Sequence, residues 1–254
     1  IYEELGDLLG QANALNNLGV DAYYEGRWQE ALDFYEQSKS LRERIGDVVG
    51  AATVTNNIAE IKSDQGYLAT ARELFEEAQN VFEAAGHRML ATLALSNLGR
   101  TAGREGRLDD ARRTLEEARA TFEEIDAAGY ALEARVRLAE RAALAEDATD
   151  ALAQADAALT AIAEAAGGSL HHAFVHRIRG FALAQQGDLD GADAAFAESL
   201  ELAREAEETY ELALTLEAIG RVKELRGQDG SAEAGEARGL LARLGVVSTP
   251  EVPI

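Results

Sequence analysis

An alanine recurs at an almost constant spacing through the whole chain. Its copies are separated by 40, 40, 40, 41 and 40 residues and are Ala31, Ala71, Ala111, Ala151, Ala192 and Ala232. A fixed period of this size indicates stacked copies of one supersecondary unit. Stacked units form a long curved surface and have no buried catalytic cleft by default. The period therefore constrains both the fold and the place where function is expected.

Small residues at further positions keep the phase of the alanine column. Twelve residues before the alanines lie Gly19, Ala59, Gly99, Ala139, Gly180 and Gly220. Five residues before them lie Gly26, Gly66, Gly106, Glu146, Gly187 and Gly227. The first set lets helix backbones approach closely, and the second predicts a turn of positive φ between two helices. Glu146 breaks the second set, so the fourth unit is irregular.

Each unit is predicted to be a helix, a short turn and a second helix, because apolar residues follow a helical period on both sides of the turn. We predict first helices near 11–25, 49–65, 89–105, 130–145, 170–186 and 209–226. We predict second helices near 28–45, 68–85, 108–125, 148–166, 189–206 and 230–244. Trp28, Tyr35 and Phe75 occupy packing positions in this pattern.

The unit resembles the tetratricopeptide repeat, which has Leu-Gly in its first helix, Gly at the turn, and Ala four residues before an aromatic. The matching residues are Leu18-Gly19, Gly26, Ala31 and Tyr35, then Ile58-Ala59, Gly66, Ala71 and Phe75, then Leu98-Gly99, Gly106 and Ala111, then Gly180, Gly187, Ala192 and Phe196. The family's tryptophan and closing proline are absent, and its usual period is about 34 residues. The resemblance implies an all-α fold, a right-handed α-solenoid of about six helix-turn-helix repeats.

The same frame divides the chain. Six repeats are expected at about 9–47, 48–87, 88–128, 129–168, 169–207 and 208–245, followed by a tail at 246–254. Residues 1–8 align with the end of a second helix, and the chain does not begin with Met. We therefore expect a fragment of a longer protein. The sixth unit has Glu236 where the aromatic belongs, as atypical terminal repeats do when they act as caps.

Charge and composition exclude some partners. The formal net charge is −22, which disfavours direct nucleic-acid binding. Zero cysteine and no apolar run near 18 residues favour a cytoplasmic location without membrane contact. Acidic pairs fall on the second helices, where we expect a solvated outer face: Glu76-Glu77, Glu116-Glu117 and Glu123-Glu124.

The inner face of first helices is where the resemblance implies partner binding. The groove residues that it implies are Asn13, Asn16, Asn17, Tyr23, Tyr24, Asn56, Asn57, Glu60, Asn97, Arg100, Arg104, Arg137, Arg177 and Phe181. Several families of these repeats use asparagines to bracket the backbone of an extended peptide, and Asn17, Asn57 and Asn97 form such a column. The alternative is that these amides bond to neighbouring helices or turns.

The arginines of the inner face also allow two interpretations. Arg100, Arg104, Arg137 and Arg177 could hold an acidic segment or a terminal carboxylate through forked hydrogen bonds. They could instead pair with nearby acidic residues, which are Glu60, Glu133 and Glu140.

The sequence gives little support for a metal site or for catalysis. His172 and His176 share one helix face, but a zinc site would need ligands from another helix, so no metal or other cofactor is expected. The sequence offers no nucleophile with a plausible base, and we expect no enzyme activity.

The expected function is therefore a protein–protein interaction and regulatory scaffold. Its partner would be a peptide, a protein segment or the parent protein's own domains. The repeat style resembles C-terminal regions of actinobacterial multidomain signalling proteins, such as cyclases with an ATPase module and large transcriptional regulators. The alternative is a self-association scaffold, a homodimer for example, that buries exposed Leu93, Phe174 and Phe181. A metal-responsive module is the third class.

Overall fold

The computed structural model describes residue 2 and residues 6–164 and 171–254. Among these residues the first helices of the repeats are α2 (Leu8–Tyr24), α4 (Val48–Asp64), α6 (Arg88–Arg104), α8 (Ala128–Leu144), α10 (His172–Gln185) and α12 (Thr209–Leu225). The second helices are α3 (Trp28–Arg44), α5 (Leu68–Ala84), α7 (Leu108–Glu124), α9 (Ala148–Glu164), α11 (Leu189–Glu205) and α13 (Ser231–Leu244). The predicted helical solenoid is confirmed, and the helix bounds differ from prediction by at most three residues.

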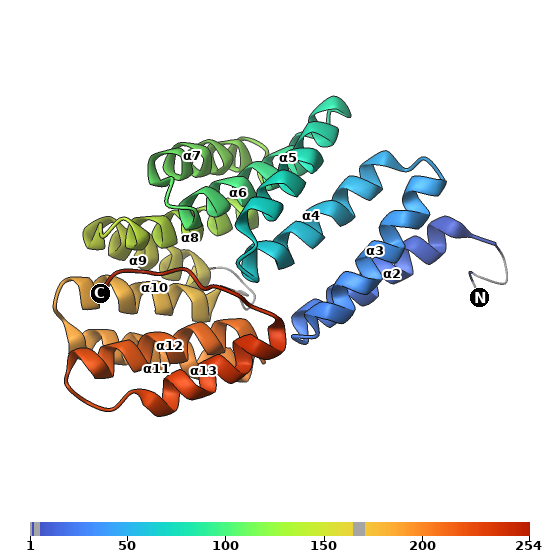
Figure 1. The fold of residues 1–254 in the computed structure, drawn as a ribbon. Coiled ribbons are helices and arrows are strands. Elements are labelled where there is room, and N and C mark those ends of the chain that lie inside the picture. The colour runs from blue at the N-terminus through green and yellow to red at the C-terminus, as the bar shows by residue number, and fades with distance from the viewer. Residues whose placement is uncertain (1, 3–5, 165–170) are drawn as a thin grey trace.

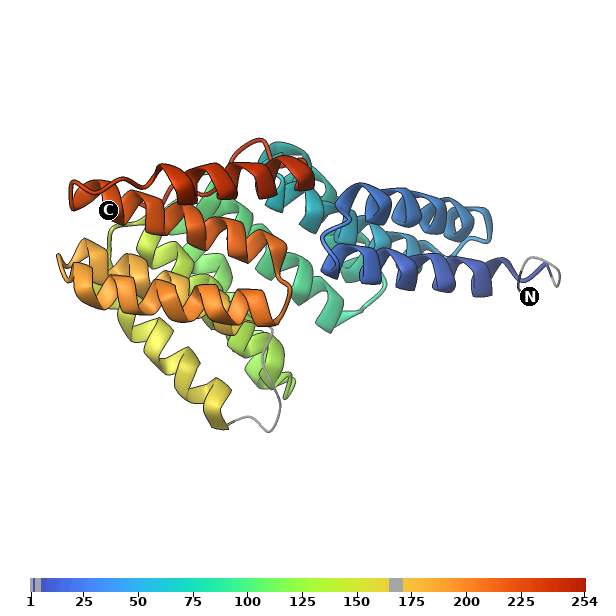
Figure 2. The same cartoon turned by 90° about the horizontal axis from the view of Figure 1, so that it is seen from below.

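The helices form two layers (Figures 1 and 2). Each first helix packs on its second helix, and the first helices α4, α6, α8, α10 and α12 also contact one another in series. The second helices form the outer layer, where the predicted acidic pairs are exposed to solvent. The inner layer therefore holds the polar residues that the sequence placed on the groove.

The turn between the two helices is the same in every repeat. The five glycines of the turn column have positive φ, as predicted, and Gly66 has φ +90°. Glu146 takes the same left-handed conformation with φ 57° although it has a Cβ. The fourth repeat is thus irregular in sequence but keeps the turn.

The alanine column is buried in five repeats, where Ala31 and its counterparts through Ala192 have no exposed surface. The expectation for Ala232 is wrong, because Ala232 is exposed and α13 buries Ala237, Leu240 and Leu244 instead. Gly220 there faces the backbone carbonyl of Gly230 rather than an aromatic ring. The last repeat therefore packs in a different register.

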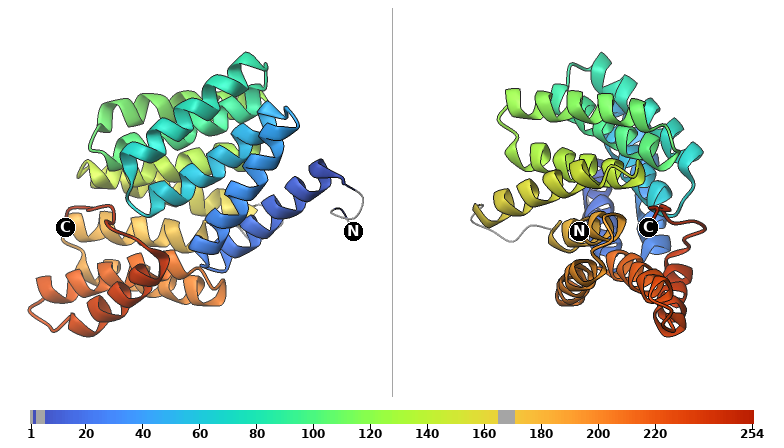
Figure 3. Two further views of the ribbon diagram at one scale, coloured as in Figure 1. Left: turned by 45° about the vertical axis from the view of Figure 1, so that its right-hand side comes forward. Right: turned by 90° about the vertical axis from the view of Figure 1, so that its left-hand side faces the viewer.

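The solenoid curls back until its two ends meet (Figures 1 and 3). The rings of Trp28 and Tyr210 lie 5.2 Å apart between centroids, which joins the first repeat to the last. Leu244 at the end of α13 packs in the same cluster as Trp28 and Leu32. The Nε2 of Gln65 donates a hydrogen bond to the Leu244 carbonyl at 3.0 Å. These contacts close the superhelix on itself.

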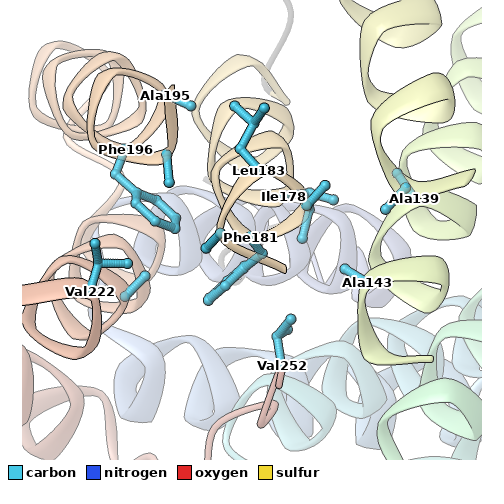
Figure 4. Packing of buried hydrophobic residues seen from close by; sticks show 14 of the residues in the cluster. Ala139, Ala143, Ile178, Phe181, Leu183, Ala195, Phe196, Val222 and Val252 are labelled. Carbon is cyan, nitrogen blue, oxygen red and sulfur yellow. The ribbon is translucent and has the colours of Figure 1, made fainter. Parts of the chain in front are cut away.

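Residues 246–254 cross the turn edge of the repeats as an extended segment (Figure 1). The N–H of Val247 donates to the carbonyl of Gln65 at 2.9 Å, and Nε2 of Gln185 donates to the carbonyl of Pro253 at 2.9 Å. Val252 is 1% exposed and packs into a cluster with Phe181 and Ala143 (Figure 4). This segment, called the C-terminal strap below, ties α4 to α10.

No helix in the described part of the chain is both long and apolar enough to cross a membrane.

Candidate ligand-binding cavity

Closure of the solenoid leaves a partly open cavity of about 240 Å³ against its inner layer. Helices α2, α4, α6 and α8 supply one side of the lining, with Tyr23, Tyr24, Glu60, Asp64, Arg100, Glu133 and Arg137. The start of α10 and of α12 and the turn before α3 supply the other, with His171, Phe174, Glu208, Tyr210, Glu211 and Trp28. The wall is thus charged and aromatic, and its two sides come from opposite ends of the chain.

A buried ion-pair network lies at one edge of this cavity. Arg104, whose side chain is 2% exposed, donates to Asp64 at 2.8 Å and to Glu140 at 3.3 Å. Arg100 contacts the same two carboxylates at 3.1 and 3.4 Å. Burial alone would raise the pKa of Glu140, but Arg104 and Arg100 lower it to about 2. The network therefore stays ionised and links α4, α6 and α8.

The other two predicted arginines are paired as well. Arg137 donates to Ser96 Oγ at 2.8 Å and to the carboxylate of Glu133. Arg177 is buried against the carboxylate of Glu211, and its guanidinium lies 4.9 Å from the ring centroid of Phe174. The four arginines thus have carboxylate partners within the protein, as the second interpretation of the sequence expected. An acidic segment would have to compete for them.

The predicted asparagines bond to one another between repeats. Asn97 Nδ2 donates to Asn56 Oδ1 at 3.1 Å and to Glu60 Oε1 at 2.9 Å, and both amides are 3% exposed. Asn57 Nδ2 donates to Asn16 Oδ1 at 3.2 Å. These amides join α2, α4 and α6 in the way that the alternative interpretation proposed.

Other predicted groove residues lie away from the cavity. Asn13 accepts a hydrogen bond from Arg42 at 2.6 Å, and Asn17 is exposed on α2. Phe181 is 4% exposed, so its expected place on the groove surface is wrong. Its ring meets that of Phe196 edge-on at 5.3 Å, because Gly180 leaves room for α11 to approach (Figure 4).

The expected self-association surface also changes. Leu93 and Phe174 are half-buried rather than exposed, because Leu93 packs beside α7 and α8 and Phe174 beside the core of α10. With Phe181 buried, these three side chains do not form the apolar patch that the sequence suggested.

Five predicted residues do line the cavity, namely Tyr23, Tyr24, Glu60, Arg100 and Arg137. Glu208 and Tyr210 were missed. They belong to the sixth repeat and reach the cavity only because the superhelix closes, a contact that leaves no periodic signal in the sequence.

Burial alters the chemistry of several lining groups. Burial and the charge of Glu211 raise the pKa of Glu208 to about 7. Burial raises the pKa of Tyr23 well above its usual value, and its hydroxyl donates to Asp64 at 3.2 Å. The hydroxyl of Tyr210 is buried and has no hydrogen-bond partner among the described residues. The cavity thus offers an unused polar group beside aromatic walls.

Metal ligands do not gather in this region. Across residues 6–164 and 171–254, no group of three His, Asp or Glu side chains is placed to hold a metal ion. Burial lowers the pKa of His176, which favours its neutral form.

Comparison with known proteins finds tetratricopeptide repeats in the first half of the chain. Models of the tetratricopeptide repeat match residues 11–45 and 50–124. A search of curated protein sequences found no match.

Solved structures share the fold at low sequence identity. The Rap conjugation gene regulator of the plasmid pLS20, in complex with a Phr peptide, is 13% identical, with TM-score 0.74 over 99% of this chain and 80% of its own. A Rap protein complexed with Competence and Sporulation Factor is 15% identical, with TM-score 0.75 over 94% of this chain and 65% of its own. Aspartyl phosphate phosphatase F from Bacillus subtilis is 15% identical, with TM-score 0.72 over 98% of this chain and 64% of its own.

This chain therefore spans about two thirds of the length of the second and third of these structures. At such identities the likeness concerns the fold alone. The matched segments, residues 11–45 and 50–124, are tetratricopeptide repeats, and helical hairpins continue from there to Leu244.

Proposed function

We propose that this protein is a binding scaffold that holds an extended peptide or protein segment on the inner layer of the solenoid. The observation that carries the proposal is the partly open cavity, whose lining comes from both ends of the chain and combines aromatic rings with charged groups. Small-molecule sites commonly occupy about 300–1,000 Å³. A cavity of about 240 Å³ suits one or two side chains, or one end, of a segment that continues along the groove.

Two kinds of finding support this choice. Solenoids of helical repeats use their extended concave surface for binding. Two of the fold neighbours are complexes, one with a Phr peptide and one with Competence and Sporulation Factor. The third is named as a phosphatase, so the fold alone does not decide between binding and enzyme activity. In this chain most lining carboxylates are neutralised by arginine, which favours recognition over acid–base catalysis.

The test is selection of binders from a random nonapeptide library on the immobilised protein. We expect selected peptides to bind the wild-type protein and to lose about tenfold or more in affinity with Tyr24→Ser, which removes an aromatic wall of the cavity. Tyr67→Ser is the matched control, because Tyr67 is 44% exposed and lies outside the cavity. Selection of no binder, or equal binding by both variants, contradicts the proposal.

Self-association is a second candidate, favoured by a different surface from the one expected. The outer side of α2 and α3 has a shallow groove of about 820 Å³ lined by Leu15, Leu18 and Leu41, and Leu18 is 46% exposed. Light scattering over a range of concentrations tests it. A mass that rises with concentration and returns to the monomer value in Leu18→Asp supports self-association through this groove, and a constant monomer mass excludes it.

A further inference from the structure

The cavity carries more negative charge than its own cations neutralise. Five carboxylates and two arginines line it. Three of the carboxylates have an arginine partner: Asp64 with Arg100, Glu133 with Arg137, and Glu211 with Arg177. Glu60 and Glu208 have no lysine or arginine within ion-pair distance in the described parts of the chain. Two carboxylates of the wall therefore lack a paired cation, and the charge of Arg137 acts on Glu60 only from beyond ion-pair distance.

Glu60 is held in place without being neutralised. Asn97 donates to its Oε1 at 2.9 Å and Asn56 donates to the same atom at 3.2 Å. Amide donors fix the orientation of a carboxylate but leave its charge. Burial raises the pKa of Glu60, although the charge of Arg137 acts in the opposite direction.

Glu208 stands at the other side of the wall. It is the residue before α12, yet its side chain makes no capping hydrogen bond to that helix. It is half-buried, and the nearest charge that acts on it is that of Glu211, which repels its ionised form. A residue in this position gains from a cation that enters the cavity.

The two carboxylates share the cavity with an aromatic side chain, Tyr24. Burial and the charges of Glu60, Glu133 and Glu208 raise the pKa of Tyr24, and all four residues line the cavity. The unpartnered hydroxyl of Tyr210 belongs to the same wall. Aromatic faces beside carboxylates form a favourable environment for ammonium and guanidinium groups.

We propose that Glu60 and Glu208 receive a positively charged group of the bound segment, an ammonium or a guanidinium, in the cavity that Tyr24 and Tyr210 line. The inference rests on the proposed peptide-binding function and adds the chemistry of the ligand. It reverses the charge preference expected from the arginines, because those arginines are already paired. The group could be a lysine or arginine side chain or the amino terminus of a peptide.

The experiment uses two random nonapeptide libraries that differ only at the amino terminus. In one library every peptide is N-acetylated, and in the other the terminal amine is free. Enrichment of Lys or Arg at one position in the acetylated library supports a side-chain cation, and enrichment only in the free-amine library supports a terminal ammonium. Selected peptides without any cation overturn this inference and leave the binding function standing, whereas no enrichment in either library overturns both.

Variants that remove the charge of Glu60 or Glu208 then test whether these two side chains bind the cation. For a selected peptide we expect Glu60→Gln and Glu208→Gln each to weaken binding about tenfold, while substitution of the peptide's cation by a neutral isostere removes that sensitivity. Glu201→Gln on the exposed face of α11 is the matched control and should leave the affinity unchanged. Glutamine keeps the shape of the side chain, and circular dichroism checks that each variant is folded. Unaltered affinity in both cavity variants contradicts the proposal.

Discussion

Consecutive repeats and terminal repeats are joined in different ways. Between consecutive repeats, first helices exchange periodic contacts, such as Asn97 with Asn56 and Arg104 with Asp64, residues about 40 positions apart. Between the first and last repeats, the joint consists of unique contacts, such as the tilted ring contact of Trp28 with Tyr210. The periodic joints build the inner layer, and the unique joint turns that layer into the wall of a partly open cavity. Function, as we propose it, depends on the unique joint.

The strap strengthens the unique joint. It binds Gln65 in the second repeat and Gln185 in the fifth, and it inserts Val252 into the core between α8 and α10. A solenoid with purely nearest-neighbour contacts unfolds as a one-dimensional array. Contacts between repeats two and five should make unfolding of this array more cooperative.

The largest expected loss of stability comes from removing the buried guanidinium of Arg104, which joins consecutive repeats. Arg104→Met leaves Asp64 and Glu140 buried without that guanidinium, and removal of one partner from a buried network costs about 3–5 kcal/mol. We expect the urea midpoint to fall accordingly. Arg112→Met is the control, because Arg112 forms an exposed pair with Glu116 at 3.0 Å and its loss should leave the midpoint unchanged. Equal midpoints for the two variants would contradict the assignment.

The periodic joints could be predicted from the sequence, and the unique joint could not. The glycine turn column and the buried alanines follow from a 40-residue repeat, because each repeat meets the same neighbours. Phe181 and Ala232 were misplaced for the opposite reason. They lie in the last two repeats, where the strap and a shifted α13 replace the neighbours that the period assumes.

The residues that line the cavity divide in the same way into those that could be predicted from the sequence and those that could not. Tyr24, Glu60 and Arg100 were found because they occupy inner positions of ordinary repeats. Glu208 and Tyr210 could not be found, since their contact with the first repeat depends on the curvature accumulated over the whole solenoid. Curvature arises from small rotations at each repeat, and no local pattern in the sequence encodes it.

The next largest loss of stability is expected from a substitution that displaces the C-terminal strap. Gly66→Ala places a Cβ 2.3 Å from Ser248 Oγ and 2.7 Å from its carbonyl oxygen, at φ +90°. Gly106→Ala is the matched control, because it meets the same kind of backbone strain at φ +79° and its Cβ has nothing within 4 Å. Both variants should lose about 1–2 kcal/mol from backbone strain.

The difference between these two glycine variants measures the strap. We expect Gly66→Ala to lose roughly a further 1–3 kcal/mol through the clash, and limited proteolysis to cleave within 246–254 faster than in Gly106→Ala. Indistinguishable urea midpoints and cleavage rates would mean that the strap does not stabilise the closed solenoid.

A smaller effect concerns Glu208, whose burial is a consequence of closure. Its pKa is raised to about 7 in the folded protein. The protonated side chain therefore makes its full contribution to the free energy of unfolding below its ordinary pKa, and that contribution is lost as pH rises through 7. Glu208→Gln should therefore match the wild-type protein near pH 4.5 and exceed it at pH 8 by about 1–2 kcal/mol, allowing for partial exposure. Glu208 lines two cavities. The titratable and charged groups that share them are Tyr23, Tyr24, Glu60, Asp64, Arg100, Glu133, Arg137, His171, Tyr210 and Glu211 in the first, and His172 and Glu205 in the second.

Urea midpoints at both pH values check this expectation. Glu201→Gln, on an exposed face of α11, should show no pH-dependent difference from the wild-type protein. A constant gap between Glu208→Gln and the wild-type protein across this range would show that Glu208 is fully hydrated and that closure does not bury it.

The smallest expected change in stability concerns the turn between the two helices of the fourth repeat. Glu146 occupies the same column position as Gly66 and Gly106 and adopts φ 57° with a Cβ. Glu146→Gly removes steric strain of about 1–2 kcal/mol but increases the entropy of the unfolded chain, so the free energy of unfolding should rise by about 0.5–1 kcal/mol. Ala145→Gly is the control, since φ −87° suits alanine and the change should destabilise. A rise for Glu146→Gly beside a fall for Gly106→Ala, whose added Cβ meets no atom within 4 Å, would assign both effects to the left-handed turn, and a fall for Glu146→Gly would contradict the strain at this position.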